Sequence, residues 1–248
     1  MVSPRWYIVL LAVPLLFAVV FAQSPNPPLK PLTAEQRGDI LMARKMYREA
    51  VEMYAEEKPV TAVVRNKTGI AYHQMLQFEV ARKYYEMAVK LDHNYAEAMN
   101  NLGTVYFTRK NYRRAISQYK KALHVAPQTG SFYVNLGIAY FKRKNYKEAA
   151  ESFQQAVTID PEVFEHRGSF GVILQEQTVS GEERAKFHYS LAKTYAKSGQ
   201  IQRALQYIRK ALEEGFNERK KIMDEPAFVA LREMPEFKEL VTSEPRVL

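Results

Sequence analysis

The side chains that could perform acid–base or metal chemistry are scattered along this 248-residue chain. Its histidines form neither an i, i+4 pair nor the HExxH arrangement of a catalytic zinc site. The chain has no cysteine, which excludes disulfides, thiolate zinc sites and thiol catalysis. Residues 168–171 (GSFG) lack the glycine spacing of a phosphate-binding loop, and no motif pairs Ser169 with a base. We therefore predict a protein that is not an enzyme, with no catalytic residue, no metal and no cofactor.

Two asparagines indicate recognition instead of catalysis. Asn101 and Asn135 stand 34 residues apart, and each lies two residues before a glycine. Because a side-chain amide carries both a donor and an acceptor, it can hydrogen-bond the backbone of an extended peptide without reading its side chains. The alternative is that these asparagines only bridge neighbouring helices, in which case a partner binds elsewhere.

The spacing of the two asparagines is the period of an internal repeat. Residues 106–112 (YFTRKNY) recur at residues 140–146 (YFKRKNY). The later landmarks also keep step, at Ala115, Tyr119, Ala122 and Pro127 and again at Ala149, Phe153, Ala156 and Pro161. A repeat of this length is typical of stacked helical units, each of which buries its apolar face only against its neighbours.

These landmarks resemble the tetratricopeptide repeat. Together with the N-terminal segment, they resemble an exported tetratricopeptide repeat protein of the bacterial type. The family pattern joins a Leu-Gly/Ala-x-x-Tyr helix to a second helix marked by Ala, an aromatic residue and Ala, followed by Pro. The resemblance implies an all-α solenoid of about five helix-turn-helix repeats with a C-terminal helical cap. It places units 1–4 at residues 34–163, an insertion at 164–184, unit 5 at 185–218 and capping helices at 219–248.

The residue types of each unit have physical reasons that do not depend on the family. Gly or Ala in the first helix lets the second helix approach closely, and aromatic side chains fill the wider gaps. We expect four repeated tyrosines to lie in the core: Tyr72, Tyr106, Tyr140 and Tyr195. Asn111 and Asn145 suit the turn between the helices because Asn tolerates the left-handed conformation. Pro127 and Pro161 should end the second helices.

The resemblance also implies a concave groove lined by the first helix of each unit. Relatives use asparagines there to hold a peptide backbone, and this role carries over to Asn101 and Asn135 only. The predicted groove residues are Asn66, Lys67, Asn100, Asn101, Thr104, Phe107, Asn135, Ile138, Phe141, Lys193 and Lys197, and Lys186 and Tyr189 share the face of the last two. Phe107 and Phe141 would supply apolar pockets, and the two lysines would hold an acidic group or a C-terminal carboxylate.

The N-terminus carries a targeting signal. A short basic start ending at Arg5 precedes the apolar stretch Trp6–Ala22, and a polar sequence follows. This is the pattern of a signal peptide over residues 1–22, which predicts a periplasmic or secreted protein. The alternative is a membrane anchor formed by residues 6–22, if that segment is not cleaved. Residues 23–33 contain four prolines and predict an extended linker.

The chain has a formal net charge of +9, which favours acidic partners. We expect a scaffold that binds an extended segment of a polypeptide partner in the groove, within the cell envelope, and no nucleic acid. Two different functions remain open. One is a module that binds a polyanion or a membrane surface through its basic residues, and the other is an enzyme that uses the insertion. The sequence determines neither the partner nor the oligomeric state.

Overall fold

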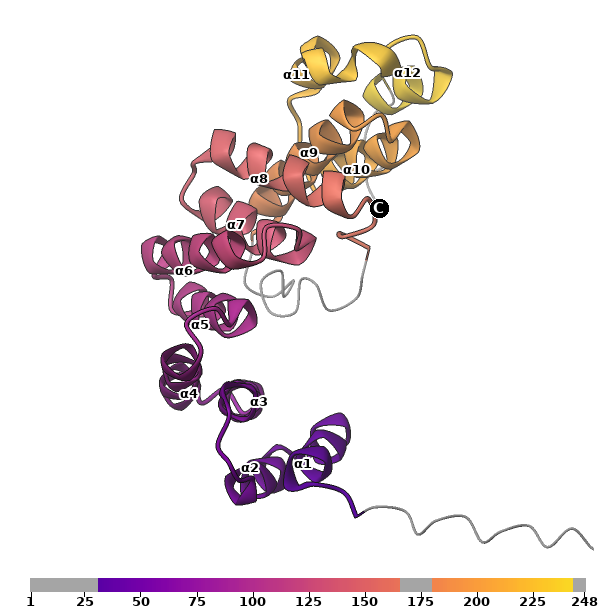
Figure 1. Cartoon of the computed structure of the whole chain (residues 1–248). Coiled ribbons are helices and arrows are strands. Elements are labelled where there is room, and N and C mark those ends of the chain that lie inside the picture. The colour runs from indigo at the N-terminus through magenta and orange to yellow at the C-terminus, as the bar shows by residue number, and fades with distance from the viewer. Residues whose placement is uncertain (1–30, 166–179, 243–248) are drawn as a thin grey trace, which may run out of the picture. The chain divides into compact units, whose positions relative to one another are not determined.

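The computed structural model describes residues 31–165 and 180–242, which form helices and turns and no strand (Figure 1). The helices after Thr33 belong to one compact unit. Four predicted features lie wholly or largely outside the described residues: the signal segment, the linker, the interior of the insertion and the last residues of the cap.

Five helical hairpins follow one another along the described residues, and in each the two helices pack together. The first helices are α1 (Ala34–Ala43), α3 (Ala62–Gln74), α5 (Ala96–Thr108), α7 (Gly130–Lys142) and α9 (Gly181–Lys197). Their partners are α2 (Tyr47–Glu56), α4 (Phe78–Leu91), α6 (Tyr112–Val125), α8 (Tyr146–Ile159) and α10 (Ile201–Glu213). The expected all-α repeat architecture is therefore confirmed.

The repeated glycines bring the two helices of a hairpin together as expected. A Cβ placed on Gly103 would lie 2.6 Å from the ring of Tyr119, and one on Gly137 would lie 2.4 Å from the ring of Phe153. Both rings are fully buried. Of the tyrosines expected in the core, Tyr140 and Tyr195 are buried, whereas Tyr72 and Tyr106 are half-buried and pack against it.

The turns inside the hairpins differ from the prediction by one residue. The left-handed residues are Lys110 (φ 59°) and Lys144 (φ 62°), not the asparagines that follow them. Asn111 instead precedes α6 with φ −85°, and its side-chain oxygen accepts a hydrogen bond from the backbone N–H of Arg114. The asparagine thus acts as an N-cap, the other position that its short polar side chain favours. The equivalent left-handed positions in the other units are Lys45, Leu76 and Gly199.

The prolines end the second helices as predicted, since α6 stops two residues before Pro127 and α8 stops two residues before Pro161.

The fifth unit starts earlier than predicted, because α9 begins at Gly181, inside the range predicted as insertion. Ser180 caps this helix by accepting a hydrogen bond from the backbone N–H of Glu183. The earlier start makes α9 17 residues long, against 13 for α7.

The C-terminal cap consists of α11 (Arg219–Asp224), the 3-10 helix η1 (Pro226–Leu231) and α12 (Pro235–Thr242). Pro226 and Pro235 each occupy the first position of a helix, where a missing N–H costs nothing. Phe228, Leu231 and Phe237 are buried, and η1 and α12 contact α9 and α10. The cap thus covers the apolar end of the last hairpin.

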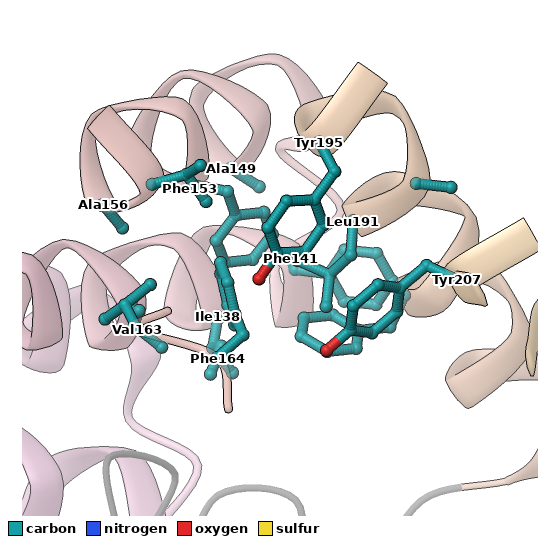
Figure 2. Close-up of a cluster of buried hydrophobic side chains, with 14 of the residues drawn as sticks. Ile138, Phe141, Ala149, Phe153, Ala156, Val163, Phe164, Leu191, Tyr195 and Tyr207 are labelled. Atoms are coloured by element: carbon teal, nitrogen blue, oxygen red, sulfur yellow. The ribbon is translucent and has the colours of Figure 1, made fainter. Parts of the chain in front are cut away.

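The largest core cluster runs from α5 to α12. Figure 2 shows its aromatic centre, where the Phe153 ring lies 5.6 Å from that of Phe164 and the Phe164 ring 6.1 Å from that of Tyr195. Phe164, the first residue of the predicted insertion, is therefore part of the core between units 4 and 5. A separate small cluster, Ala50, Tyr54 and Val64, holds the first unit.

Candidate functional site

The predicted groove asparagines bond to one another across successive units. Asn101 Nδ2 donates to Asn66 Oδ1 at 2.9 Å, and Asn66 Nδ2 donates to the Tyr95 hydroxyl at 3.3 Å. Asn135 Nδ2 donates to Asn100 Oδ1, also at 2.9 Å. These bonds join α3 to α5 and α5 to α7. They match the bridging role that the sequence left open as an alternative.

The other predicted groove residues lie in different surroundings. Phe107 and Ile138 belong to the core, and Ile138 is only 1% exposed, so the structure moves both from the predicted groove to the interior. The Thr104 hydroxyl donates to the Asn100 carbonyl and accepts a bond from the Tyr119 hydroxyl. Lys67 pairs with Glu35 and Asp39 of α1, each at 2.6 Å.

Two predicted residues, Phe141 and Lys193, line a pocket of about 360 Å³ on the first-helix surface. We call it the lysine–aromatic pocket, and its lining residues are Phe141, Tyr146, Lys186, Tyr189, Ser190, Lys193, Phe216, Glu218 and Lys221. Lys197, which was predicted beside Lys193, is exposed and does not line it.

The pocket is built on one face of α9, where Lys186, Tyr189 and Lys193 recur at three- and four-residue steps. After α10 the chain turns at Gly215, whose φ of 98° favours glycine. This turn brings Phe216 onto Tyr189, with the ring centroids 4.4 Å apart and the planes 17° from parallel. The stacked pair forms an apolar wall.

Lysine ammonium groups lie over this wall. Lys193 Nζ is 4.9 Å from the ring centroid of Tyr189, and Lys221 Nζ is 5.8 Å from the centroids of both Tyr189 and Phe216. The negative face of an aromatic ring attracts a cation at this distance. The rings therefore help to hold both cations beside the pocket.

Carboxylates partly balance these lysines. Glu218 lies 3.1 Å from Lys221, Glu225 lies 3.7 Å from Lys193, and Glu182 lies 2.5 Å from Lys186. The Tyr189 hydroxyl donates to Glu225 at 2.9 Å. Burial, together with this bond, raises the pKa of Tyr189, so its phenol stays protonated at neutral pH. The site thus combines three lysines, their three carboxylate partners and a neutral aromatic wall.

Sequence reasoning did not assign Tyr146, Phe216, Glu218 and Lys221 to a site. The last three lie at the start of the cap, so their place depends on how the chain turns after α10. The available signal was Gly215 at the helix end, followed by the basic run of residues 219–221. Neither feature indicates which face of α9 the cap covers.

Two further observations concern the described residues. No group of three or more His, Asp or Glu side chains within residues 31–165 and 180–242 could hold a metal ion. Over the same ranges, no helix combines the length and the hydropathy needed to traverse a bilayer.

The sequence and the fold are similar to those of known repeat proteins. A tetratricopeptide repeat family model matches residues 100–163, and a second model of the same description matches residues 185–214. No curated protein matches the sequence.

Solved structures of MamA share the fold. One crystal structure of MamA superposes with a TM-score of 0.51 at 22% identity, covering 77% of this chain and 93% of MamA. MamA from Desulfovibrio magneticus RS-1 has a TM-score of 0.51 at 20% identity, covering 73% of this chain and 92% of the other. At this identity the likeness bears on fold alone. The chain therefore contains tetratricopeptide repeats, and its helices form a tetratricopeptide-repeat solenoid closed by a C-terminal cap.

Proposed function

We propose that this protein is a non-catalytic scaffold that binds an extended polypeptide segment along the first helices of its repeats. The segment places an acidic group, either a side chain or a C-terminal carboxylate, in the lysine–aromatic pocket. The observation that carries the proposal is a pocket lined by Lys186, Lys193 and Lys221 beside the stacked rings of Tyr189 and Phe216.

The charges of the pocket favour an anion. Each of its three lysines pairs with a carboxylate, and at least two of these carboxylates, Glu182 and Glu218, are exposed. An exposed ion pair is worth little, about 0–1 kcal/mol, so a ligand carboxylate can replace or share it at small cost. Of the charged residues that line the pocket itself, three are lysines and one, Glu218, is acidic, so the lining favours an anion.

The size and walls of the pocket favour part of a peptide. Its volume of about 360 Å³ is at the small end of ligand sites, which span roughly 300–1,000 Å³. The aromatic wall suits an apolar side chain next to the acidic group. The ring of Phe141, from α7, extends this wall toward the preceding unit. A bound peptide that continues from the pocket would run over α7 and α5, past the asparagines that bridge these helices.

The N-terminal sequence supports a place in the cell envelope. Residues 1–22 have the pattern of an export signal, and we propose that the folded part works in the periplasm or outside the cell. A polypeptide partner there would be an envelope or secreted protein.

Selection from a displayed peptide library tests the proposal. The library contains peptides with internal acidic residues and peptides with a free C-terminal carboxylate. The chain from Gln23 onward, which retains the compact unit, should enrich sequences that place a carboxylate beside an apolar residue. Binding of the best peptide should fall about tenfold or more in the double variant Lys193→Glu/Lys221→Glu.

The matched control is Lys220→Glu, which changes a neighbouring exposed lysine that does not line the pocket. It should bind as well as the wild type. Equal affinity of the double variant would remove the pocket from the proposal, and a library without any enriched sequence would contradict polypeptide binding itself.

A further inference from the structure

Six basic side chains gather where the helices of units 3 and 4 turn. Each turn has a cation at the end of its first helix, one at the left-handed residue and one at the second position of the next helix. We call this set the basic turn edge, and its members are Arg109, Lys110, Arg113, Arg143, Lys144 and Lys147. All six are exposed.

The two turns meet at a shallow pocket. Four cations, Arg109, Lys110, Arg113 and Arg143, line it together with Asn111 and Tyr112, and its volume is about 410 Å³. No acidic side chain is among the lining residues. The repeat thus brings cations from successive units around one opening.

Few carboxylates balance this edge. Arg109 pairs with Glu79, and among the residues that the structure describes the other five cations form no ion pair. Glu148 accepts a hydrogen bond from the Asn145 side chain, and its charge also interacts with Lys147 and Arg143. An edge with six cations and so few acids should attract an extended anionic surface.

Exposed apolar side chains lie on the same edge. Leu76 is 71% exposed and occupies the left-handed position (φ 60°) of the preceding unit, a conformation that costs an L-residue energy. It shares a second shallow pocket with Arg109. Tyr146, which begins α8 beside Lys144 and Lys147, is 51% exposed. The edge therefore presents apolar groups next to cations.

This combination selects among anionic partners. A linear acidic polymer would satisfy the cations but leave Leu76 in water. The surface of a bilayer with anionic lipid offers phosphate groups to the cations, a hydrocarbon boundary to Leu76 and the headgroup level that tyrosine prefers. We propose that the basic turn edge binds peripherally to membranes that contain anionic lipid, with Leu76 and Tyr146 entering the interface. Tyr146 also lines the lysine–aromatic pocket, but none of the six cations of the edge does, so the charges of the two sites can be varied independently.

Vesicle flotation tests the proposal. The chain from Gln23 onward lacks the apolar segment 6–22 and retains the compact unit, so its binding reports on the folded part. It should float with vesicles of phosphatidylcholine and phosphatidylglycerol (3:1), weaken as salt is raised, and stay unbound with phosphatidylcholine alone.

Two variants locate the contact. A basic residue near an anionic surface contributes about fivefold to binding, so Lys110→Gln/Arg113→Gln/Lys144→Gln should bind about 100-fold more weakly. Leu76→Gln keeps the charge and should bind about fivefold more weakly because the apolar insertion is lost. The helical circular dichroism of each variant should equal that of the wild type, since all four positions are exposed.

A matched control separates location from net charge. Lys90→Gln/Lys120→Gln/Lys121→Gln removes the same charge from exposed positions on α4 and α6, away from the turns, and should bind as the wild type does. Equal loss in this control, or equal binding to pure phosphatidylcholine, would overturn the proposal. Binding to polyglutamate but not to the anionic vesicles would assign the edge to a linear acidic polymer instead. The pocket variant Lys193→Glu/Lys221→Glu retains the edge and should keep vesicle binding even if it loses peptides.

Discussion

The first hairpin and the block from α5 to α12 are held by different forces. In the first hairpin the buried apolar residues are few. The Tyr54 hydroxyl donates to Asp39 at 2.8 Å within the hairpin, and Lys67 of α3 joins the hairpin to the next unit by pairing with Glu35 and Asp39. In the C-terminal block one apolar core runs from α5 to α12, and ring contacts of Phe187 with Phe141 and Phe153 cross the boundary between units 4 and 5. A repeat array is therefore not uniform, because its stability depends on the interface between neighbouring units.

This difference predicts where the molecule opens first. Half-exposed ion pairs contribute about 0–1 kcal/mol each, whereas burying one large aromatic side chain contributes several times more. The first hairpin should open locally while the C-terminal block stays folded.

The largest effect should come from the aromatic residue at the same repeat position in the two regions. Phe153→Ala should lower the free energy of unfolding of the C-terminal block by about 4 kcal/mol, because Phe153 is fully buried against Phe164 and Phe187. Tyr54→Ala should leave the main denaturant transition unchanged and abolish hydrogen-exchange protection only in α1 and α2. If Tyr54→Ala moves the main transition as far as Phe153→Ala does, the two regions unfold as one.

A smaller effect should follow from removing the charged contact of the first hairpin. Burial lowers the pKa of Lys67, but the hydrogen bonds that its ammonium group donates to the carboxylates of Asp39 and Glu35 outweigh burial, and the pKa is raised. The contribution to stability is thus full below the ordinary pKa of lysine and is lost only as pH rises through the raised value. Lys67→Met should weaken protection of α1 and α2 by about 1–2 kcal/mol.

The control for Lys67 is Lys238→Met, which removes an exposed pair with Glu233 at 2.9 Å on the cap. It should leave exchange rates unchanged throughout. Unaltered protection of α1 and α2 in Lys67→Met would show that apolar contacts alone hold the first hairpin.

The smallest effect concerns two histidines: His73, which is buried in α3, and His188, which is half-buried in α9. Burial lowers the pKa of His73, whose Nε2 has no hydrogen-bond partner among the described residues. Burial also lowers the pKa of His188, but the nearby Glu214 opposes the shift. Because the unfolded chain then binds more protons, stability is full above about pH 6.5 and falls as pH decreases.

Stability around His73 should therefore fall as pH decreases from 7 to 5. His73→Phe should flatten the pH dependence of protection in α3 and α4, as measured by hydrogen exchange at matched exchange times. If His73→Phe keeps the full pH dependence of exchange protection in α3 and α4, that dependence comes from other titratable groups.

The sequence predicted those features that are set within one repeat. The contacts of Gly103 with Tyr119 and of Gly137 with Phe153 follow from spacing along two adjacent helices, and so do the stops before Pro127 and Pro161. The left-handed turn position was wrong by one residue, since Asn111 is equally suited to the N-cap that it occupies. Both positions are common for asparagine, so residue type alone does not separate them.

Features set between distant segments could not be predicted. The amide of Asn101 meets Asn66 only because α3 and α5 lie side by side, and nothing local fixes that distance. The lysine–aromatic pocket depends on where α11 lies against α9. The start of α9 at Gly181 was also missed, because its first turn lacks the repeat landmarks and carries Glu182 and Glu183 instead.

The contact between a first-helix glycine and a second-helix ring also constrains how this gene can change. Units 1–4 pair glycine with an aromatic residue sixteen positions later, whereas unit 5 pairs Ala192 with the smaller Ile208. Enlarging the glycine alone produces a clash, and shrinking the ring alone leaves a void. A path from one pairing to the other therefore passes through a less stable intermediate. Each unit should keep its pairing for long periods and exchange both residues nearly together.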